Sequence, residues 1–119
     1  HDRGKGEQPA RPELFGDVVL ARRDIPTSYH LSVTLDDALQ GITLVTRGED
    51  LFEATHIHRL LQALLGLPVP DYHHHGLLRD VTGKRLAKRH QSAAIRDLRA
   101  EGLTPEAVRK MAVPDRFVE

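Results

Sequence analysis

The feature that most constrains the fold is an amphipathic segment at residues 51–65. Its apolar residues recur three and four positions apart, as on one face of an α-helix: Leu51, Ala54, Ile57, Leu60, Leu61, Leu64 and Leu65. Asp50 is a good N-cap residue, Gly66 suits the position after the last turn, and Pro68 prevents continuation. These signals agree, so we predict a helix over residues 51–65.

Strand-like segments lie on both sides of this helix. Residues 42–46 are mainly apolar and precede a short polar turn, and residues 72–78 form a candidate strand after the helix. A strand, a polar turn and a helix in this order are typical of a crossover unit in a parallel sheet. Apolar and polar residues alternate over residues 29–35, which predicts a strand with one buried face. The short apolar run within residues 16–24 predicts another strand.

Two further helices are expected in the C-terminal part. Ser92 is a candidate cap for the first, which ends at Gly102. Thr104 is a candidate cap for the second, with Pro105 at its first position and Met111 among its inward-facing residues.

Length and element order indicate one α/β domain. A chain of 119 residues can form a single core of modest size. Residues 1–15 are rich in Gly, Pro, Arg and Lys and lack periodicity, so we expect a flexible N-terminal segment ahead of a domain over residues 16–119.

The composition excludes several classes of protein. The 17 Lys and Arg residues balance 17 Asp and Glu, so any attraction to nucleic acid must come from a local patch. The absence of cysteine excludes disulfides and thiolate zinc sites and is compatible with a reducing cytosol, so we expect a cytoplasmic protein. No apolar run approaches the ~18 residues that span a bilayer, and no apolar signal-peptide core is present, so we expect it to be soluble.

The strongest local patch is the basic loop at Gly83–His90, GKRLAKRH. Its cations repel one another unless an anion lies among them, and a polyphosphate is a suitable partner. A solvated surface turn is the alternative interpretation.

Arg47 and Tyr29 are the candidate residues for binding a carboxylate. A guanidinium donates two parallel hydrogen bonds to a carboxylate, and Arg47 follows a predicted strand whose end can hold it rigidly. The alternative for Arg47 is a surface charge, and for Tyr29 a core or edge aromatic. Asp50 is expected to serve as a helix cap rather than as a ligand group.

The eight histidines raise the question of a metal site. His73 and His75 would share one face of a strand, but no third ligand at a fixed spacing is visible. His56 and His58 diverge on a helix, because each residue turns the helix by about 100°. We therefore expect neither a native metal site nor zinc.

From about Gly16 onward the chain resembles the class I glutamyl-tRNA synthetase family. The resemblance lies in SYHLSVTLDDALQGITLVTRGEDLFEATHIHRLLQALLGLPVPDYHHHGLL and in Arg85–Arg89, which match the five positions of the KMSKS-type motif. GEDL followed by FEATHIHRLL is closer to the shortened glutamyl-Q tRNA(Asp) synthetase branch. The resemblance implies the second half of a Rossmann-like catalytic domain, with parallel strands and flanking helices.

The resemblance also implies roles for individual residues. Tyr29 and Arg47 match the family's glutamate-contacting Tyr and Arg, and Leu77 and Leu78 match the pair whose backbone borders the adenine of ATP. The basic motif matches the ATP loop: Arg85, Leu86, Ala87, Lys88 and Arg89. Within it, Lys88 would stabilise the charge that builds up as pyrophosphate leaves. Ala87 stands where Ser is frequent, which removes one hydroxyl contact.

The implied reaction joins glutamate to ATP, with Mg²⁺, as glutamyl-adenylate and passes the glutamyl group to queuosine in tRNA(Asp). The family's HIGH-type signature and zinc-binding cysteines do not occur in this sequence, so we expect the chain alone to be inactive. Three alternatives stay open. They are a discriminating glutamyl-tRNA synthetase, a non-catalytic phosphate- or RNA-binding module, and an interaction protein that self-associates through an open sheet edge.

Overall fold

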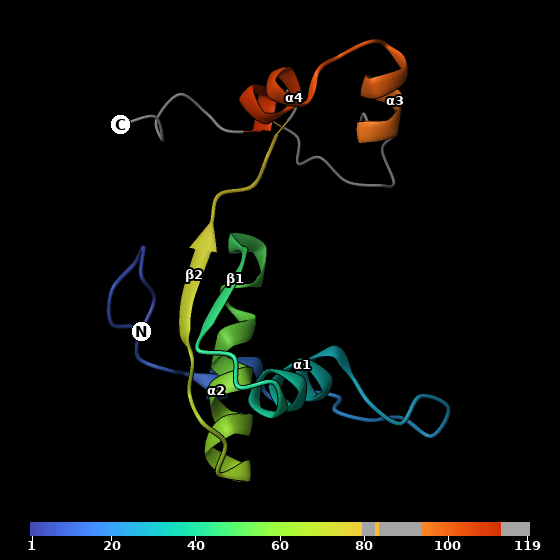
Figure 1. The fold of residues 1–119 in the computed structure, drawn as a ribbon. Coiled ribbons are helices and arrows are strands. Elements are labelled where there is room, and N and C mark those ends of the chain that lie inside the picture. The colour runs from blue at the N-terminus through green and yellow to red at the C-terminus, as the bar shows by residue number, and fades with distance from the viewer. Residues whose placement is uncertain (80–82, 84–93, 113–119) are drawn as a thin grey trace. The chain divides into compact units, whose positions relative to one another are not determined.

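The computed structural model describes residues 1–79, 83 and 94–112. The chain divides into two compact units, His1–Gly76 and Leu77–Glu119. The first unit carries both strands and the two longest helices (Figure 1).

The first unit is built on a strand–helix–strand crossover. Strands β1 (Leu44–Gly48) and β2 (Asp71–His75) are parallel neighbours. The 3₁₀ turn η2 (Glu49–Leu51) and helix α2 (Ala54–Leu65) connect them. The predicted α/β architecture and its crossover are therefore confirmed, although β2 ends earlier than the predicted strand over residues 72–78.

Helix α2 ends as predicted but begins later. Gly66 has φ 64°, in the left-handed region that glycine adopts without strain. Asp50 is not the cap, because the chain leaves β1 through the 3₁₀ turn and Glu53 occupies the N-cap position of α2.

The predicted strand over residues 29–35 is wrong, since helix α1 spans Tyr29–Leu39. Leu31 and Leu35 are four residues apart, so the alternating pattern fits a helical face as well as a strand. The Ser28 hydroxyl decides between the two, because it accepts the Leu31 N–H at 3.4 Å and caps the helix.

The predicted strand within residues 16–24 is also wrong, because this segment belongs to an irregular loop. The Ser28 N–H donates to the Leu20 carbonyl at 2.8 Å, and the Arg22 N–H donates to the Ile25 carbonyl at 2.8 Å. The apolar run is short, and these local hydrogen bonds take the place of pairing with the sheet.

The first residues of the chain are ordered against β2, where we expected little structure. The Tyr72 N–H donates to the His1 carbonyl at 2.9 Å, and the Arg3 N–H donates to the Tyr72 carbonyl at 2.7 Å. Asp2 is consequently buried, with 3% of its surface exposed. The division between residues 15 and 16 stays a prediction.

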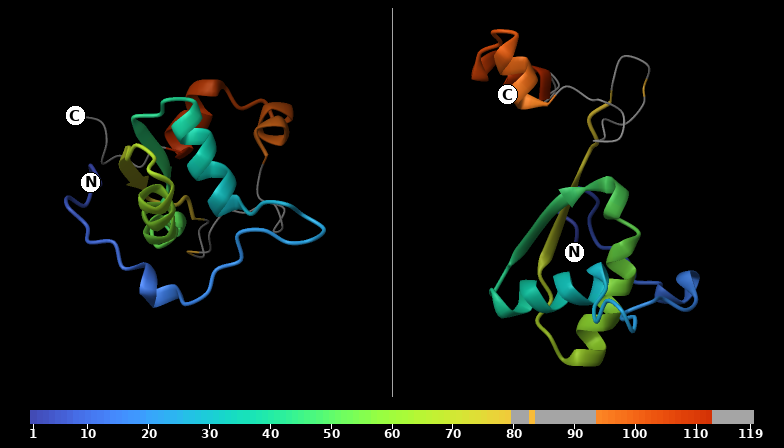
Figure 2. Two further views of the ribbon diagram at one scale, coloured as in Figure 1. Left: turned by 90° about the horizontal axis from the view of Figure 1, so that it is seen from below. Right: turned by 90° about the vertical axis from the view of Figure 1, so that its right-hand side faces the viewer.

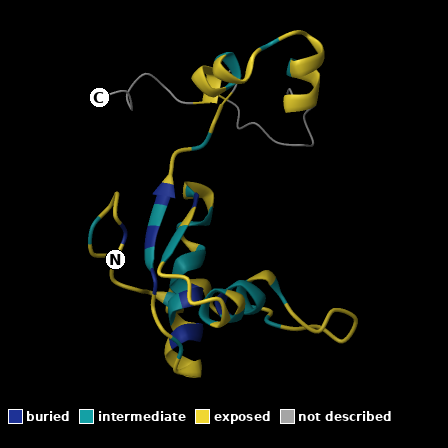
Figure 3. Cartoon of the chain, in the orientation of Figure 1, coloured by how far each residue is buried: buried dark blue, intermediate teal, exposed yellow. Residues whose placement is uncertain are grey.

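The buried residues of the described chain lie within the first unit (Figure 3), and more of them are polar than apolar. Helix α1 and the 3₁₀ turn η1 (Pro12–Phe15) pack on α2, and Figure 2 shows α1 crossing beside it. The buried apolar side chains are Ile57, Leu61 and Tyr72. The buried polar residues are Asp2, Thr34, Arg47, His58, Gln62 and His74. A polar network therefore occupies the position between sheet and helix where an apolar core would be expected.

In the second unit the structure describes α3 (Ile95–Ala100) and α4 (Pro105–Ala112). The Thr104 cap is confirmed, since its Oγ1 accepts a first-turn N–H at 3.2 Å. Met111 is 62% exposed rather than inward-facing. The predicted Ser92 cap lies outside the described residues. None of the helices in the described ranges has the length and apolar character needed to cross a membrane.

Candidate functional site

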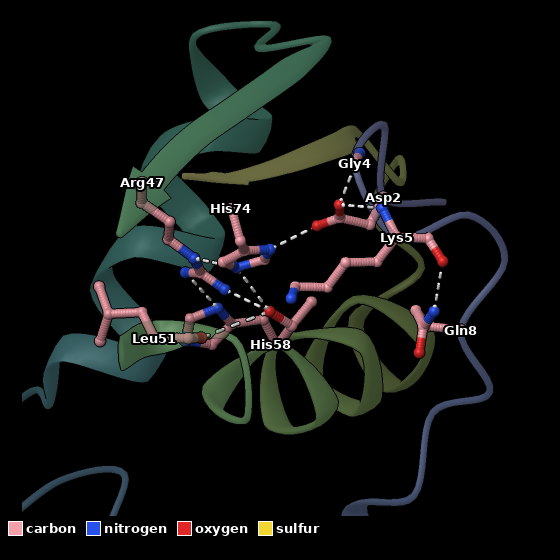
Figure 4. Close-up of polar contacts among 9 residues, drawn as sticks. Asp2, Gly4, Lys5, Gln8, Arg47, Leu51, His58 and His74 are labelled. Carbon is pink, nitrogen blue, oxygen red and sulfur yellow. Dashed lines mark hydrogen bonds and ion pairs between the residues drawn. The ribbon is translucent and has the colours of Figure 1, made fainter. Parts of the chain in front are cut away.

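Arg47 is buried within β1 instead of standing at an exposed strand end. The residue is 9% exposed, and the strand register places it opposite His74 of β2. In Figure 4 both side chains point toward α2, where His58 lies. The structure therefore excludes the interpretation of Arg47 as a solvated surface charge.

The Arg47 guanidinium donates hydrogen bonds from all three of its nitrogens. Nε donates to His74 Nε2 at 3.0 Å, and Nη1 is 3.1 Å from His58 Nδ1. Nη2 donates to Thr55 Oγ1 at 2.6 Å. The central carbon of the guanidinium lies 5.4 Å from the centre of the Tyr72 ring, within cation–π range. Neighbours on β2 and on α2 thus hold the cation.

Asp2 stands behind His74 in this network. Its Oδ2 is 2.6 Å from His74 Nδ1, and its Oδ1 accepts the N–H groups of Gly4 and Lys5 at 2.9 and 3.0 Å. Burial by itself would raise the pKa of Asp2, but these hydrogen bonds outweigh it and lower the pKa below its usual value. The N-terminal turn therefore places an ionised carboxylate within hydrogen-bonding distance of His74 Nδ1.

His58 is the neutral partner on α2. Its pKa is lowered to about 3, mainly by burial and then by the nearby positive charge of Arg47. Its Nε2 is 3.1 Å from His30 Nδ1, so the network continues into α1.

Tyr29 is the first residue of α1 and is 49% exposed. Its ring centre lies 5.8 Å from that of His58, edge to face. The two residues predicted to bind glutamate, Tyr29 and Arg47, therefore share His58 as a neighbour. Their contact with a ligand stays a prediction.

The residues predicted to bind ATP are described only in part. Leu77 and Leu78 follow β2 and begin the second unit, and Leu78 is 43% exposed. The motif Arg85–Arg89, with Lys88, lies outside the described residues, so its convergence with Arg47 stays a prediction. Within the described ranges, no three His, Asp or Glu side chains form a group that could hold a metal ion.

A cavity of about 280 Å³ lies on another side of the network. Asp2, Phe52, Thr55, Arg59, Tyr72 and His74 are among the residues that line it. Neither Arg47 nor Tyr29 lines it, so this cavity does not coincide with the predicted glutamate contacts. Tyr29 is 49% exposed, so solvent reaches its side chain.

The sequence interpretation missed three residues of the network: Asp2, His58 and His74. The burial of His74 could have been predicted, because His74 lies two residues after Tyr72 and a strand places both side chains on one face. For His58 the signal was weaker, since its spacing from Thr55 and Gln62 marks a polar stripe beside the apolar face of α2. For Asp2 there was no signal, because its burial depends on pairing with a strand far along the chain.

Comparison with known proteins identifies the family. Residues 2–114 match the family described as tRNA synthetases class I (E and Q), catalytic domain. A glutamyl-Q tRNA(Asp) synthetase of Rhodobacter capsulatus is 63% identical over 111 residues, which are 90% of this chain and 40% of that protein. A glutamate–tRNA ligase of Aquifex aeolicus is 39% identical over 104 residues, which are 87% of this chain and 22% of that protein.

Solved structures agree with the sequence matches. The crystal structure of a glutamate tRNA ligase from Elizabethkingia meningosepticum, in complex with its amino acid, superposes with a TM-score of 0.55 at 31% identity. The superposition covers 73% of this chain and 16% of that one. The chain thus spans 40% or less of the length of these relatives, and it belongs to the class I tRNA synthetases for glutamate and glutamine, within their catalytic domain.

Proposed function

We propose that the chain is part of a ligase of the glutamyl-Q tRNA(Asp) synthetase type. Such a ligase activates glutamate with ATP to glutamyl-adenylate and transfers the glutamyl group to queuosine of tRNA(Asp). The supporting observation is the buried Arg47 guanidinium, which keeps donors for a carboxylate, in a chain 63% identical to a protein of that name. A cytoplasmic location, without a membrane partner, is part of the proposal.

Glutamate would be bound at Arg47 and Tyr29. The α-carboxyl group is consumed when glutamyl-adenylate forms, so the side-chain carboxylate is the anionic group left on the amino acid. A guanidinium can bind that group with two parallel hydrogen bonds, and a tyrosine hydroxyl can add a third. The geometry of Arg47, buried and oriented by three hydrogen bonds, supports this assignment.

ATP would be bound by the segments after β2. Leu77 and Leu78 are proposed to border the adenine, and the loop Arg85–Arg89 to lie along the phosphates. In that loop the Lys88 ammonium would stabilise the negative charge of the leaving pyrophosphate. Mg²⁺ would reach the site on the ATP phosphates, because Mg²⁺ commonly binds through substrate phosphates.

The alternatives differ in the ligand that they require. A fragment of a discriminating glutamyl-tRNA synthetase would use the same glutamate contacts, but the 63% identity to the R. capsulatus protein, against 39% to the A. aeolicus ligase, favours the glutamyl-Q type. A phosphate- or RNA-binding module would use only the basic loop and would show no preference for glutamate. Self-association through an open sheet edge would require neither ligand.

A calorimetric titration with a non-hydrolysable glutamyl-adenylate analogue tests the proposal. We expect the chain to bind the analogue and Arg47→Lys to weaken binding by about tenfold or more, because an ammonium cannot reproduce the two-point contact. Lys88→Ala should change this affinity little, because the analogue lacks the pyrophosphate that Lys88 is proposed to contact, and Lys110→Ala, an equal change on α4, should have no effect. Equal affinity of the wild-type chain and the Arg47→Lys variant would contradict the assignment.

A further inference from the structure

The proton positions in the network follow from the chemistry of Arg47. A guanidinium has only donors, so both imidazole nitrogens that face it must carry lone pairs. His74 accepts at Nε2, which places its proton on Nδ1, where it is donated to Asp2 Oδ2. His58 accepts at Nδ1, which places its proton on Nε2, where it is donated to His30 Nδ1. Each histidine is therefore restricted to one tautomer.

We infer that Asp2, His74 and His58 are positioning residues for Arg47, because their fixed tautomers hold the guanidinium in one orientation. The inference rests on the proposed function for the identity of the ligand, a carboxylate. The geometry behind it is independent of any ligand. Asp2 fixes the tautomer of His74, and His74 and His58 bind two different nitrogens of Arg47.

The orientation matters because of the donors that remain. A guanidinium has five N–H groups, and three of those of Arg47 are used within the described part of the chain. Two are left for a carboxylate, which matches the two parallel hydrogen bonds of a bidentate contact. Ordering a long side chain before the ligand arrives removes the entropy cost of ordering it at binding.

Neutral partners also preserve the charge of Arg47. A carboxylate bonded directly to the guanidinium would occupy its donors and compete with an anionic ligand. In this structure the carboxylate of Asp2 is one imidazole away, so it orients the guanidinium without occupying it.

Asp2→Asn distinguishes positioning from mere burial. The amide oxygen of asparagine can keep the Gly4 and Lys5 N–H bonds that Asp2 Oδ1 now accepts. Its NH₂ group then faces His74 Nδ1 and donates to it. We expect His74 to move its proton to Nε2, which deprives the Arg47 Nε–H of its acceptor.

Long-range ¹H–¹⁵N spectra of the ligand-free chain read out these tautomers directly. For the wild type we expect protonated Nδ1 in His74, protonated Nε2 in His58, and separate resonances for the two Nη atoms of Arg47. In Asp2→Asn we expect the His74 tautomer to switch and the Arg47 Nη resonances to average. Asp71→Asn, the same change in a partly exposed carboxylate on β2, should leave all three signals unchanged.

Substitutions of His58 provide a second test in case the Asp2→Asn variant fails to fold. Asparagine places an oxygen near the position of the imidazole Nδ1, so His58→Asn should keep separate Arg47 Nη resonances, whereas His58→Leu should lose them. The backbone amide spectrum reports whether each variant is folded. Averaged Arg47 resonances in the wild type, or an Asp2→Asn spectrum with unchanged His74 and Arg47 signals, would overturn the inference.

Ligand binding separates the failure of this inference from that of the proposed function. With the glutamyl-adenylate analogue, Asp2→Asn should raise Kd about tenfold, and Asp71→Asn should not change it. If Arg47→Ala abolishes binding while Asp2→Asn has no effect, the positioning role is wrong and the proposed function stands. If Arg47→Ala has no effect on binding, the glutamate site itself is wrong, even where the tautomers agree.

Discussion

At the scale of single residues, the most informative feature is that a buried arginine is held by uncharged groups. Its acceptors are His74, His58 and Thr55, and the Asp2 carboxylate acts through His74. Breaking a buried charged hydrogen bond typically costs several kcal/mol, so each acceptor constrains the arginine strongly. This arrangement is suited to a cation that must stay available to an anionic ligand.

His58 makes stability depend on pH, with a sign that can be worked out. Its folded pKa of about 3 lies below the ordinary value of 6.5, so the unfolded chain binds more protons between these values. Its contribution is therefore fully present above pH 6.5 and is lost as pH falls toward 3. Between pH 7 and pH 5 we expect the free energy of unfolding to drop by about 2 kcal/mol from this group alone, as measured by urea titration.

His58→Asn is the matched control for that prediction, because asparagine keeps an acceptor for Arg47 and does not titrate. The variant should lose less stability than the wild type over the same interval, and the difference isolates His58 from other titrating groups. An equal loss in both proteins would contradict the shifted pKa.

At the scale of helices and strands, α2 is the element that organises the site. It connects β1 to β2, and it presents His58 and Thr55 to the arginine on β1. Its boundaries are set by local chemistry: a 3₁₀ turn at the start and left-handed Gly66 at the end. The position of this helix therefore decides where two of the three acceptors of Arg47 lie.

Gly66→Ala tests the C-terminal boundary of α2. A Cβ at this position would meet no atom within 4 Å, so the cost arises only from the backbone at φ 64°. We expect a loss of about 1 kcal/mol in the free energy of unfolding. Gly76→Ala, which is equally open but lacks a positive φ, should be neutral or slightly stabilising. Equal effects of the two substitutions would show that the left-handed conformation is not what ends the helix.

Elements whose signals were local could be predicted, and those that depend on distant partners could not. The periodicity and C-terminal signals of α2, the apolar segment of β1 and the Thr104 cap of α4 were readable from the sequence. The segment at residues 29–35 fits two periods, and only the Ser28 cap distinguishes them. Arg47 could be singled out by its chemistry, whereas Asp2 could not, because its burial is created by pairing with Tyr72.

At the scale of the whole molecule, the chain belongs to a catalytic domain but spans 40% of the length of its R. capsulatus relative. The described residues hold the arginine proposed for glutamate, and the loop proposed for ATP lies outside them. Binding of a ligand and catalysis are therefore separate questions for this chain.

We predict that the purified chain of 119 residues shows no glutamate-dependent ATP–pyrophosphate exchange. Adenylate formation requires both substrates to be held in a near-attack geometry, and a loss of positioning on one side costs many orders of magnitude in rate. Measurable exchange that is abolished by Lys88→Ala would show that the chain is catalytically sufficient and that this expectation is wrong.

The central claim is that Arg47 recognises the side-chain carboxylate of an activated glutamate. Its most direct test is a pair of calorimetric titrations with glutamyl- and glutaminyl-sulfamoyl adenosine, which differ only in whether that group is a carboxylate or an amide. We predict that the glutamyl compound binds at least about tenfold more tightly, and that Arg47→Ala removes the preference. Equal affinities for the two compounds in the wild-type chain would contradict the claim.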